Sequence, residues 1–432
     1  MTSAALFNVW KSCGFKSSPY FQDVLQESSD TKSLRLFVGR EEEQRQLLTT
    51  IGSSDSSRQA VAGFPGVGKT TLVQYIKAEA KKANYCVSDE FISITPEHSS
   101  DALLGQLIAG IYDSICACEP ELKDREEMKN ACHFVEFTRQ RNISGGMQIM
   151  GIGGEISVST EIHDPIVGLT LPARHIIKNL LKCVLDENKF EGVILHLNNI
   201  ENLSESDTLK AADLLRSVRD TGLMVDGLHL IVVGPTSAVQ DVINRHRQIE
   251  SVFTPIMILE QLTLSDVHKL LENRYEALKI DSGQPFHRLI KNSIVEELYT
   301  IFCGDLRGIL KSLDHGIKTL LLRNRNDTIS LPFTLADFRP IIRELSQQES
   351  EKLERNLGDL NWERIVNWAD KDLDSTQTQE SLSRIWAISV GNVSIKIREL
   401  ITAGAVEALP KRVERKIQYL LTGSARLATY KK

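Results

Sequence analysis

The chain has 432 residues, of which 41% are hydrophobic and 25% are charged, and its formal net charge is −6. These values are typical of a globular protein with two or three domains. No apolar run approaches the roughly 18 residues of a membrane span, and the first residues lack the pattern of a secretory signal. The 7 cysteines show no paired spacing, which predicts reduced thiols and a cytoplasmic location.

Five regions follow one another along the sequence. Residues 1–36 are irregular and polar, and we treat them as an N-terminal extension. Residues 37–261 alternate predicted strands with helices, a pattern that indicates an α/β domain with a parallel sheet. Residues 262–346 are predicted helices without strands between them, as in a helical lid. An acidic helical linker is predicted at 347–375, and a separate basic domain at 376–432.

A glycine-rich loop separates the first predicted strand from the helix that follows it. Residues 63–70, GFPGVGKT, fit the pattern G-x-x-x-x-G-K-[ST] in the context that this motif requires. Backbone N–H groups of such a loop and the start of its helix surround a phosphate. Lys69 would place its charge at the β- and γ-phosphates, and the Thr70 hydroxyl would ligate Mg²⁺. We therefore expect ATP and Mg²⁺ to be bound by Gly63, Pro65, Gly66, Val67, Gly68, Lys69, Thr70 and Thr71.

The strand predicted at 192–199 ends in Asn198 and Asn199, and we expect it to lie adjacent to the loop. A hydrolase presents an Asp there to orient the metal's water shell and a Glu to polarise the attacking water. Asparagine carries no charge and cannot take up a proton. We expect tight nucleotide binding with slow or absent hydrolysis. Two alternatives stay open: Glu201 acts as the base, or the strand is an ordinary core strand.

Residues 144–162 alternate apolar with small or polar residues on both sides of Gly153 and Gly154. A Gly-Gly pair is a strong turn signal, so the segment predicts a β-hairpin inserted in the sheet domain. The segment contains no Lys or Arg, which favours an apolar protein contact over a grip on DNA. An ordinary extension of the sheet is the alternative.

The basic domain at 376–432 contains ten Lys/Arg and four Asp/Glu, so it carries +6 and the rest of the chain −12. Such asymmetry indicates contact with a polyanion. Two helices followed by a hairpin with a basic tip predict a winged helix. Gly404 would end its second helix, whose predicted inward residues are Val393, Ile397, Leu400 and Ile401.

This winged helix would bind double-stranded DNA through its second helix and its wing. Phosphate contacts would supply most of the affinity and make it salt-dependent. Asn392, Ser394 and Lys396 would approach the major groove, and Lys411, Arg412 and Arg415 would contact phosphates. A winged helix that serves as a protein contact or an autoinhibitory plug is the alternative.

Several of these motifs resemble those of AAA+ and STAND ATPases. Residues 37–41, FVGRE, resemble a box that packs near adenine, which implies roles for Val38, Gly39 and Arg40. Residues 198–203, NNIENL, resemble the acidic turn of the origin-recognition and initiator branch of AAA+. On that register Asn198 replaces the metal-side Asp and Asn199 the catalytic Glu.

The same resemblance extends to the lid and to the first sensor strand, and covers roughly residues 35–325 plus the C-terminal domain. GDLRGIL, residues 304–310, is similar to the second-sensor helix, with Arg307 directed at the γ-phosphate. Thr236 or Ser237 would be the first sensor residue. Arg245 and Arg247 lie where an arginine finger for a neighbouring subunit would fall.

The resemblance implies a P-loop sheet domain with a helical lid, followed by a winged helix. It also implies an ATP-binding, initiator-like protein whose nucleotide state controls self-assembly and the binding of DNA or a protein partner. Two alternatives belong to other classes. One is a STAND-like switch that recruits a protein without binding DNA, and the other is an active ATPase that uses Glu201.

Overall fold

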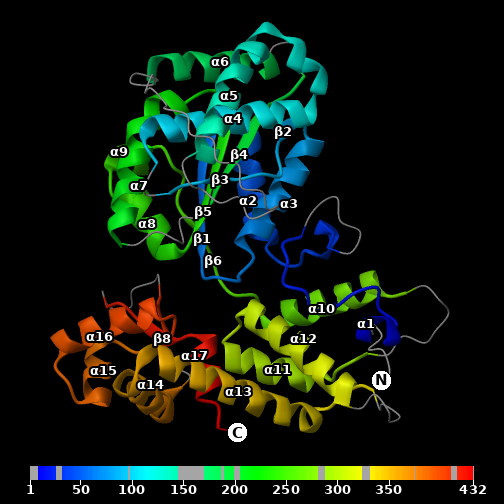
Figure 1. Ribbon diagram of the computed structural model, residues 1–432, viewed down its shortest axis with the longest axis vertical. Coiled ribbons are helices and arrows are strands. Elements are labelled where there is room, and N and C mark those ends of the chain that lie inside the picture. The colour runs from blue at the N-terminus through cyan, green and yellow to red at the C-terminus, as the bar shows by residue number, and fades with distance from the viewer. Residues whose placement is uncertain are drawn as a thin grey trace. The chain divides into compact units, whose positions relative to one another are not determined.

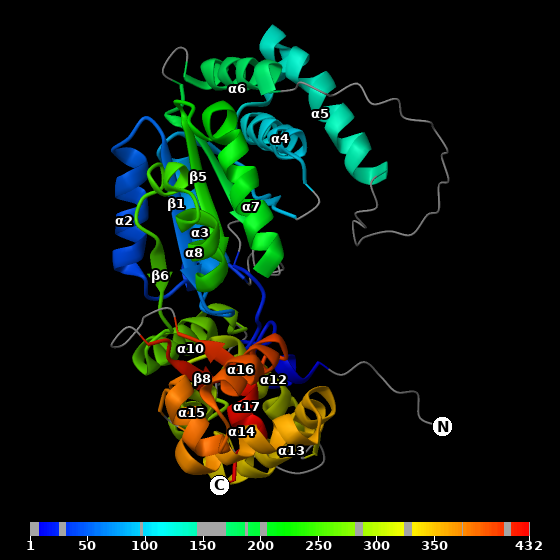
Figure 2. The same cartoon turned by 90° about the vertical axis from the view of Figure 1, so that its left-hand side faces the viewer.

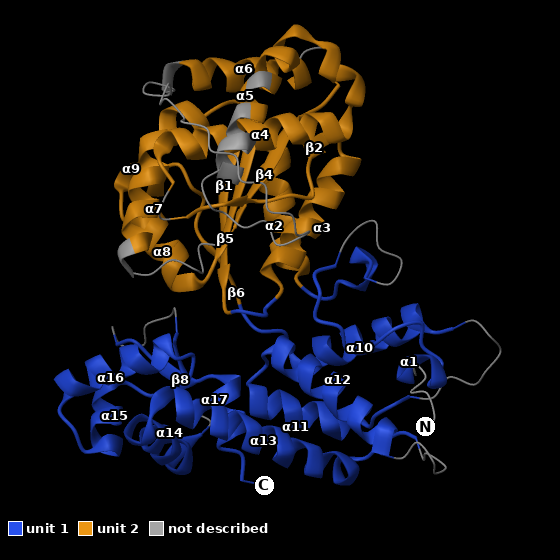
Figure 3. Ribbon diagram, in the orientation of Figure 1, with its two compact units in different colours: residues 1–39, 65–67, 260–432 blue, residues 40–64, 68–259 orange. Residues whose placement is uncertain are grey.

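The computed structural model describes residues 8–25, 32–95, 98–144, 170–185, 189–198, 205–280, 288–323, 331–373, 375–409 and 416–431. The chain divides into two compact units, which Figure 3 shows in different colours. We call residues 40–64 and 68–259 the sheet unit. Residues 1–39, 65–67 and 260–432 form the helical unit.

The sheet unit is built on a parallel sheet, as the alternation of strands and helices predicts (Figure 1). Its strands within the described residues are β1 (Ser57–Gly63), β2 (Tyr85–Val87), β3 (Ile92–Ser93), β4 (Gly192–Asn198), β5 (Leu228–Gly234) and β6 (Met257–Leu259). Their order is β2-β4-β5-β1-β6, and β3 also pairs with β4. Every residue of β1, β4 and β5 is buried, because helices cover both faces of the sheet (Figure 2).

The helices of the sheet unit are α2 (Glu41–Gly52), α3 (Lys69–Lys82), α4 (Ser100–Cys118), η2 (Pro120–Asp124), α5 (Glu126–Ser144), α6 (Thr170–Leu185), α7 (Glu205–Val218), η5 (Arg219–Leu223), α8 (Thr236–Asn244) and α9 (Arg247–Glu250). Most helices of the sheet unit alternate with strands, but α4, η2, α5 and α6 follow one another between β3 and β4. The hairpin predicted at 144–162 lies outside the described residues except for Ser144, which ends α5.

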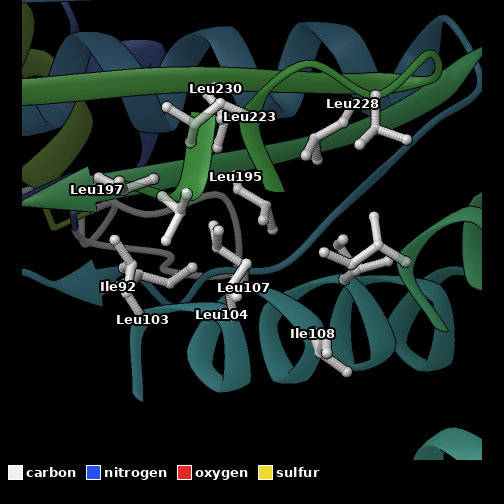
Figure 4. Close-up of a cluster of buried hydrophobic side chains, with 14 of the residues drawn as sticks. Ile92, Leu103, Leu104, Leu107, Ile108, Leu195, Leu197, Leu223, Leu228 and Leu230 are labelled. Atoms are coloured by element: carbon white, nitrogen blue, oxygen red, sulfur yellow. The ribbon is translucent and has the colours of Figure 1, made fainter. Parts of the chain in front are cut away.

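Helix α4 lies at the centre of the main apolar core. Its side chains Leu104 and Leu107 face Leu195 of β4 (Figure 4), and all three are buried. By length and composition alone, α4 is one helix among the described residues that could cross a membrane. Its apolar composition is accounted for by this packing, since the helix covers one face of the sheet.

The helical unit contains the lid and the C-terminal domain. Its helices are α1 (Val9–Ser12), η1 (Leu34–Leu36), α10 (Leu264–Leu278), α11 (Asn292–Phe302), α12 (Leu306–Arg323), α13 (Leu335–Leu357), α14 (Asp359–Asp372), α15 (Gln379–Trp386), α16 (Val390–Thr402) and α17 (Gly423–Ala428). Strands β7 (Val406–Ala408) and β8 (Tyr419–Leu421) pair antiparallel after α15 and α16. Two helices followed by this two-stranded wing form the predicted winged helix.

The N-terminal segment differs from the irregular, polar extension that the sequence suggests. Trp10, Phe15 and Tyr20 are buried in one core with α10, α11 and α12. The hydroxyl groups of Tyr20 and Tyr275 lie 2.6 Å apart. The Arg274 guanidinium donates to two backbone carbonyls of the same segment. The aromatic anchors have no helical or strand period, so periodicity could not reveal that they are buried.

The residues expected to form a linker also belong to a core. Helix α13 runs without a break across the lid boundary expected at 346, and α14 contributes Ile365 and Trp368 to the core of α15 and α16. Arg426 of α17 donates to the carbonyls of Thr300 and Ile301 in α11. The lid and the winged helix therefore share one compact unit.

In α16, three of the four predicted inward residues are buried, and the fourth prediction is wrong. Val393, Ile397 and Leu400 are at most 2% exposed, whereas Ile401 is 39% exposed. Successive helical residues are rotated by about 100°, so Ile401 lies beside the stripe that the other three define.

Candidate functional site

The glycine-rich loop connects β1 to α3 with the backbone shape that its glycines permit. Gly66 and Gly68 have φ angles of 84° and 91°, in the left-handed region that favours glycine. Among the described residues, no side chain caps the N-terminus of α3. The first N–H groups of this helix have no partner within the helix, and the helix dipole adds a partial positive charge. These features suit a phosphate group.

Lys69 lies in the first turn of α3 and is buried within the loop. Its Nζ donates to the carbonyl oxygens of Gly63 and Phe64, at 2.9 Å each. These bonds hold the ammonium group against the loop backbone, where a phosphate would be cradled. Thr70, the next residue, is half-buried in the same turn.

The end of β4 lies at the same edge of the sheet as this loop. The register aligns both Ala60 of β1 and Leu197 of β4 with Val232 of β5. Asn198 is therefore level with Val61, two residues before β1 ends at Gly63. In the sheet, β5 lies between β4 and β1, the strand that leads into the loop.

Asn198 is 8% exposed and is the last residue of β4. Its carbonyl accepts a hydrogen bond from the backbone N–H of Ile94, beside β3. The Asn198 side chain offers an amide and no carboxylate at this position. The proposed substitutes for the catalytic acid, Asn199 and Glu201, lie outside the described residues.

The sheet face behind Asn198 contains buried basic groups that the sequence motifs do not reveal. His196 lies two residues before Asn198 and hence on the same face. Within the described part of the chain, neither ring nitrogen of His196 has a hydrogen-bond partner. Burial, and to a smaller extent the Lys77 ammonium, lower the pKa of His196 to about 3. Burial also lowers the pKa of Lys77 to about 8.

The two candidates for the first sensor residue differ in their burial. Thr236 begins α8 just after β5, the strand between β1 and β4, and it is 7% exposed. Its Oγ1 has no hydrogen-bond partner among the described residues. Ser237 is exposed. Thr236 is thus a buried hydroxyl at the edge of the sheet where the loop lies.

Arg307, the predicted second sensor, is exposed in the first turn of α12. Its backbone N–H donates to Oδ1 of Asp305 at 3.0 Å. Burial raises the pKa of Asp305, whereas hydrogen bonds from the N–H groups of Gly308 and Arg307 act in the opposite direction. In the helical unit, a Cβ added to Gly66 would lie 2.7 Å from Oδ1 of Asp305, so this position has no room for a side chain.

The box expected near adenine is divided between the two units. Val38 is buried in the core of the helical unit, and Gly39 belongs to the same unit. Arg40 starts the sheet unit, and its guanidinium contacts Glu43 at 3.1 Å. Gly39 and Arg40 both have positive φ angles, which shape the entry into α2.

The predicted arginine-finger residues lie at the junction of α8 and α9. Arg245 and Arg247 are both exposed, as a contact with a neighbouring subunit would require. His246 between them is 2.8 Å from Asp213 of α7. The finger role of these arginines stays a prediction.

The predicted DNA contacts are only partly described. Asn392 is exposed on α16, and Ser394 and Lys396 are half-buried there. The Lys396 ammonium lies 2.8 Å from each carboxylate oxygen of Glu399, so a phosphate would compete with that carboxylate. The wing residues Lys411, Arg412 and Arg415 lie outside the described residues.

Comparison with known proteins identifies the loop-bearing part of the chain. Residues 36–233 match the family model of the AAA ATPase domain. This part of the chain is similar to the AAA ATPase domain. No curated protein sequence matches the chain.

Three solved structures align with nearly the whole chain. The ORC2 protein of Aeropyrum pernix, solved as ADPNP-ADP complexes, is 15% identical over 96% of each chain, with a TM-score of 0.49. The ORC1 protein of the same organism, solved with DNA, is 13% identical over 91% of this chain and 92% of that chain, with a TM-score of 0.42. Cdc6p from Pyrobaculum aerophilum is 14% identical over 94% and 96%, with a TM-score of 0.39. With TM-scores below 0.5, these similarities decide neither activity nor partners.

Proposed function

We propose that this chain is an ATP-binding switch of the initiator-like kind, which hydrolyses ATP slowly or not at all. One observation carries the proposal. The carboxyl end of β1 continues into a complete phosphate loop with Lys69 and Thr70, while β4 ends in Asn198 at the same edge of the sheet.

The residues for binding fit a nucleoside triphosphate with Mg²⁺. Lys69 is already held within the loop and supplies a cation, and the uncapped start of α3 supplies N–H donors. The Thr70 hydroxyl would ligate Mg²⁺, with the phosphates as further oxygen ligands. Among the described residues there is no cluster of three His, Cys, Asp or Glu side chains that would hold a metal without the nucleotide.

The residue that ends β4 does not supply the carboxylate that efficient hydrolysis requires. An amide at Asn198 can accept a hydrogen bond from a metal-bound water, but it adds no negative charge. Loss of a general base typically lowers the rate by about 10² to 10⁴. Thr236 and Arg307 would still contact a bound γ-phosphate. Such a contact requires a hydrogen-bond donor and a positive charge, and it requires no base.

Calorimetric titration and a steady-state phosphate-release assay test this part of the proposal. We expect ATP binding that depends on Lys69, together with negligible turnover. Ordinary turnover that is abolished by Lys69→Ala would refute the switch. If Glu201→Gln also abolished that turnover, the chain would be an active ATPase with Glu201 as its base.

The output of the switch is proposed to be self-assembly and binding of duplex DNA through the winged helix. The support is the fold of α15, α16 and the β7–β8 wing, together with the +6 charge of residues 376–432. We expect duplex affinity to fall steeply with salt, because the slope of log K against log salt is about −0.9 per phosphate contact. The double variant Lys411→Ala/Arg412→Ala would flatten that slope by about 2.

Measurements of duplex binding with ATP, with ADP and without nucleotide test this output. Nucleotide-dependent binding that weakens in the wing variant supports the proposal. The exposed apolar residues Val390 and Ile395 of α16 favour the second candidate, a switch that recruits a protein. Absence of salt-sensitive duplex binding under all three conditions would select that candidate.

A further inference from the structure

Two cysteines that are far apart in the sequence meet at the edge of the sheet. Cys86 is buried on the edge strand β2, and Cys118 ends α4 and is half-buried. The Cys118 sulfur accepts a hydrogen bond from the backbone N–H of Val87 at 3.3 Å. The same sulfur lies 3.9 Å from the carbonyl oxygens of Tyr85 and Val87. It is thus placed against the backbone on both sides of Cys86.

The surroundings give the two thiols different proton affinities. The neighbouring Cys86 thiol lowers the pKa of the Cys118 thiol, and the Val87 N–H and the Lys81 charge act in the same direction. Burial and Glu119 oppose this shift in the pKa of Cys118. The neighbouring Cys118, followed by burial, raises the pKa of Cys86. Cys118 is therefore the half-buried thiol that loses its proton more readily, and Cys86 is the buried thiol that keeps its proton.

We propose that Cys118 and Cys86 form an oxidation site, at which a hydroperoxide converts the two thiols into a disulfide. The Cys118 thiolate attacks one peroxide oxygen and breaks the O–O bond, which gives a sulfenic acid and, after protonation, one water. The Cys86 sulfur then attacks the Cys118 sulfur and displaces the hydroxyl group as a second water. The two thiols lose two electrons and two protons, and hydrogen peroxide is reduced to two waters.

The disulfide would restrain the part of the sheet that pairs with Asn198. The segment between Cys86 and Cys118 contains β3, whose Ser93 pairs with Asn198 of β4. A covalent link from β2 to α4 restricts the unfolded chain and holds this segment at its place in the sheet. We expect the oxidised protein to unfold at a higher temperature than the reduced protein.

A second pair of thiols provides the internal comparison. Cys116 and Cys132 both lie close to Tyr112, which is one turn before Cys116 in α4. Burial raises the pKa of Cys116. Cys116 is therefore less often a thiolate than Cys118 at neutral pH, and should react more slowly with peroxide.

Peptide mapping of the full chain tests the proposal. The protein is treated with hydrogen peroxide, its remaining thiols are alkylated, and it is digested with a protease that cuts after glutamate. Cys86 then lies in peptide 80–90, Cys116 and Cys118 in 98–121, and Cys132 in 128–136, because the bond between Glu119 and Pro120 is not cut. We expect 5 of the 7 thiols to remain, and 80–90 to be joined to 98–121 through Cys118. A link to 128–136, or the retention of all thiols, would overturn the proposal.

Variants and one measurement on the reduced protein sharpen this test. Cys118→Ser should abolish the disulfide, Cys116→Ser should retain it, and Cys86→Ser should leave Cys118 as a sulfenic acid that a 1,3-diketone traps. If Cys86→Ser fails to fold, alkylation rates of the unaltered protein still decide the assignment. We expect Cys118 to be alkylated faster at pH 7 than Cys303, which is also half-buried. Equal rates would contradict the proposed site.

Discussion

The carboxyl ends of β1 and β4 lie at one edge of the same sheet but carry different chemistry. β1 leads into Gly63 and a loop that already holds the Lys69 ammonium, whereas β4 ends in the neutral Asn198. Phosphate binding rests on backbone N–H groups and a cation, while activation of water rests on a carboxylate. If separate strands supply these two functions, as we propose, a chain can lose one function and keep the other.

Introducing an acidic pair at positions 198 and 199 is the most direct way to break this contrast. We expect the double variant Asn198→Asp/Asn199→Glu to increase steady-state phosphate release by about 10² to 10⁴, the range that a general base contributes. The same double variant combined with Lys69→Ala provides the control and should release no phosphate. Unchanged turnover in a double variant that still binds ATP would show that more than these two side chains is missing.

Removing the cation tests the β1 side of the contrast. We expect Lys69→Ala to weaken ATP binding roughly 10- to 100-fold, because a hydrogen bond to a charged group contributes about 1.5–3 kcal/mol. Lys82→Ala is the matched control, since Lys82 lies at the exposed end of the same helix and pairs with Glu79. Equal titration results for the two variants would contradict the assigned role of the loop.

The free energy of unfolding should decrease in acid because of the buried His196, which lies on the same sheet face as Asn198. The pKa of His196 is about 3 in the folded protein against 6.5 without burial, so the unfolded chain binds more protons between these values. The contribution of His196 to stability is therefore complete above pH 6.5 and is lost as pH falls toward 3. We expect this residue to reduce the free energy of unfolding by up to about 1.4 kcal/mol per pH unit in that window.

Denaturant titrations at pH 7.5, 6 and 5 measure this dependence. The variant His196→Leu should lose the part of the pH dependence that is due to His196. It should keep the part that is due to His229, because burial lowers the pKa of His229 to about 4. His315→Gln, at an exposed position of α12, provides the control and should keep the full dependence. An unchanged pH dependence in His196→Leu would exclude this histidine as its source.

The smallest expected effect concerns Thr236, which follows β5, the strand that lies between β1 and β4. Thr236→Val keeps the shape of the side chain but removes the buried hydroxyl. We expect a 2- to 10-fold loss of affinity for ATP, as for one neutral hydrogen bond, with little change for ADP. Ser237→Ala, at the exposed neighbour, should change neither affinity. An equal loss for ATP and ADP would mean that Thr236 does not contact the γ-phosphate.

Contiguous motifs could be read from the sequence because their geometry is local. The motif from Gly63 to Thr70 predicts the backbone path of the loop, and the alternation of strands and helices predicts the parallel sheet. The stripe of Val393, Ile397 and Leu400 likewise predicts the buried side of α16, since a helix repeats every 3.6 residues. The asparagine at position 198 is also visible in the sequence, because identifying a residue type needs no coordinates.

Relations between distant segments were decided only by the tertiary structure. Strand order places β5 between β1 and β4, and burial separates Thr236 from Ser237. The burial of Phe15 and the meeting of Cys86 with Cys118 depend on which surfaces pack together. Packing brings together residues with no fixed spacing along the chain, so neither periodicity nor motif spacing records these contacts.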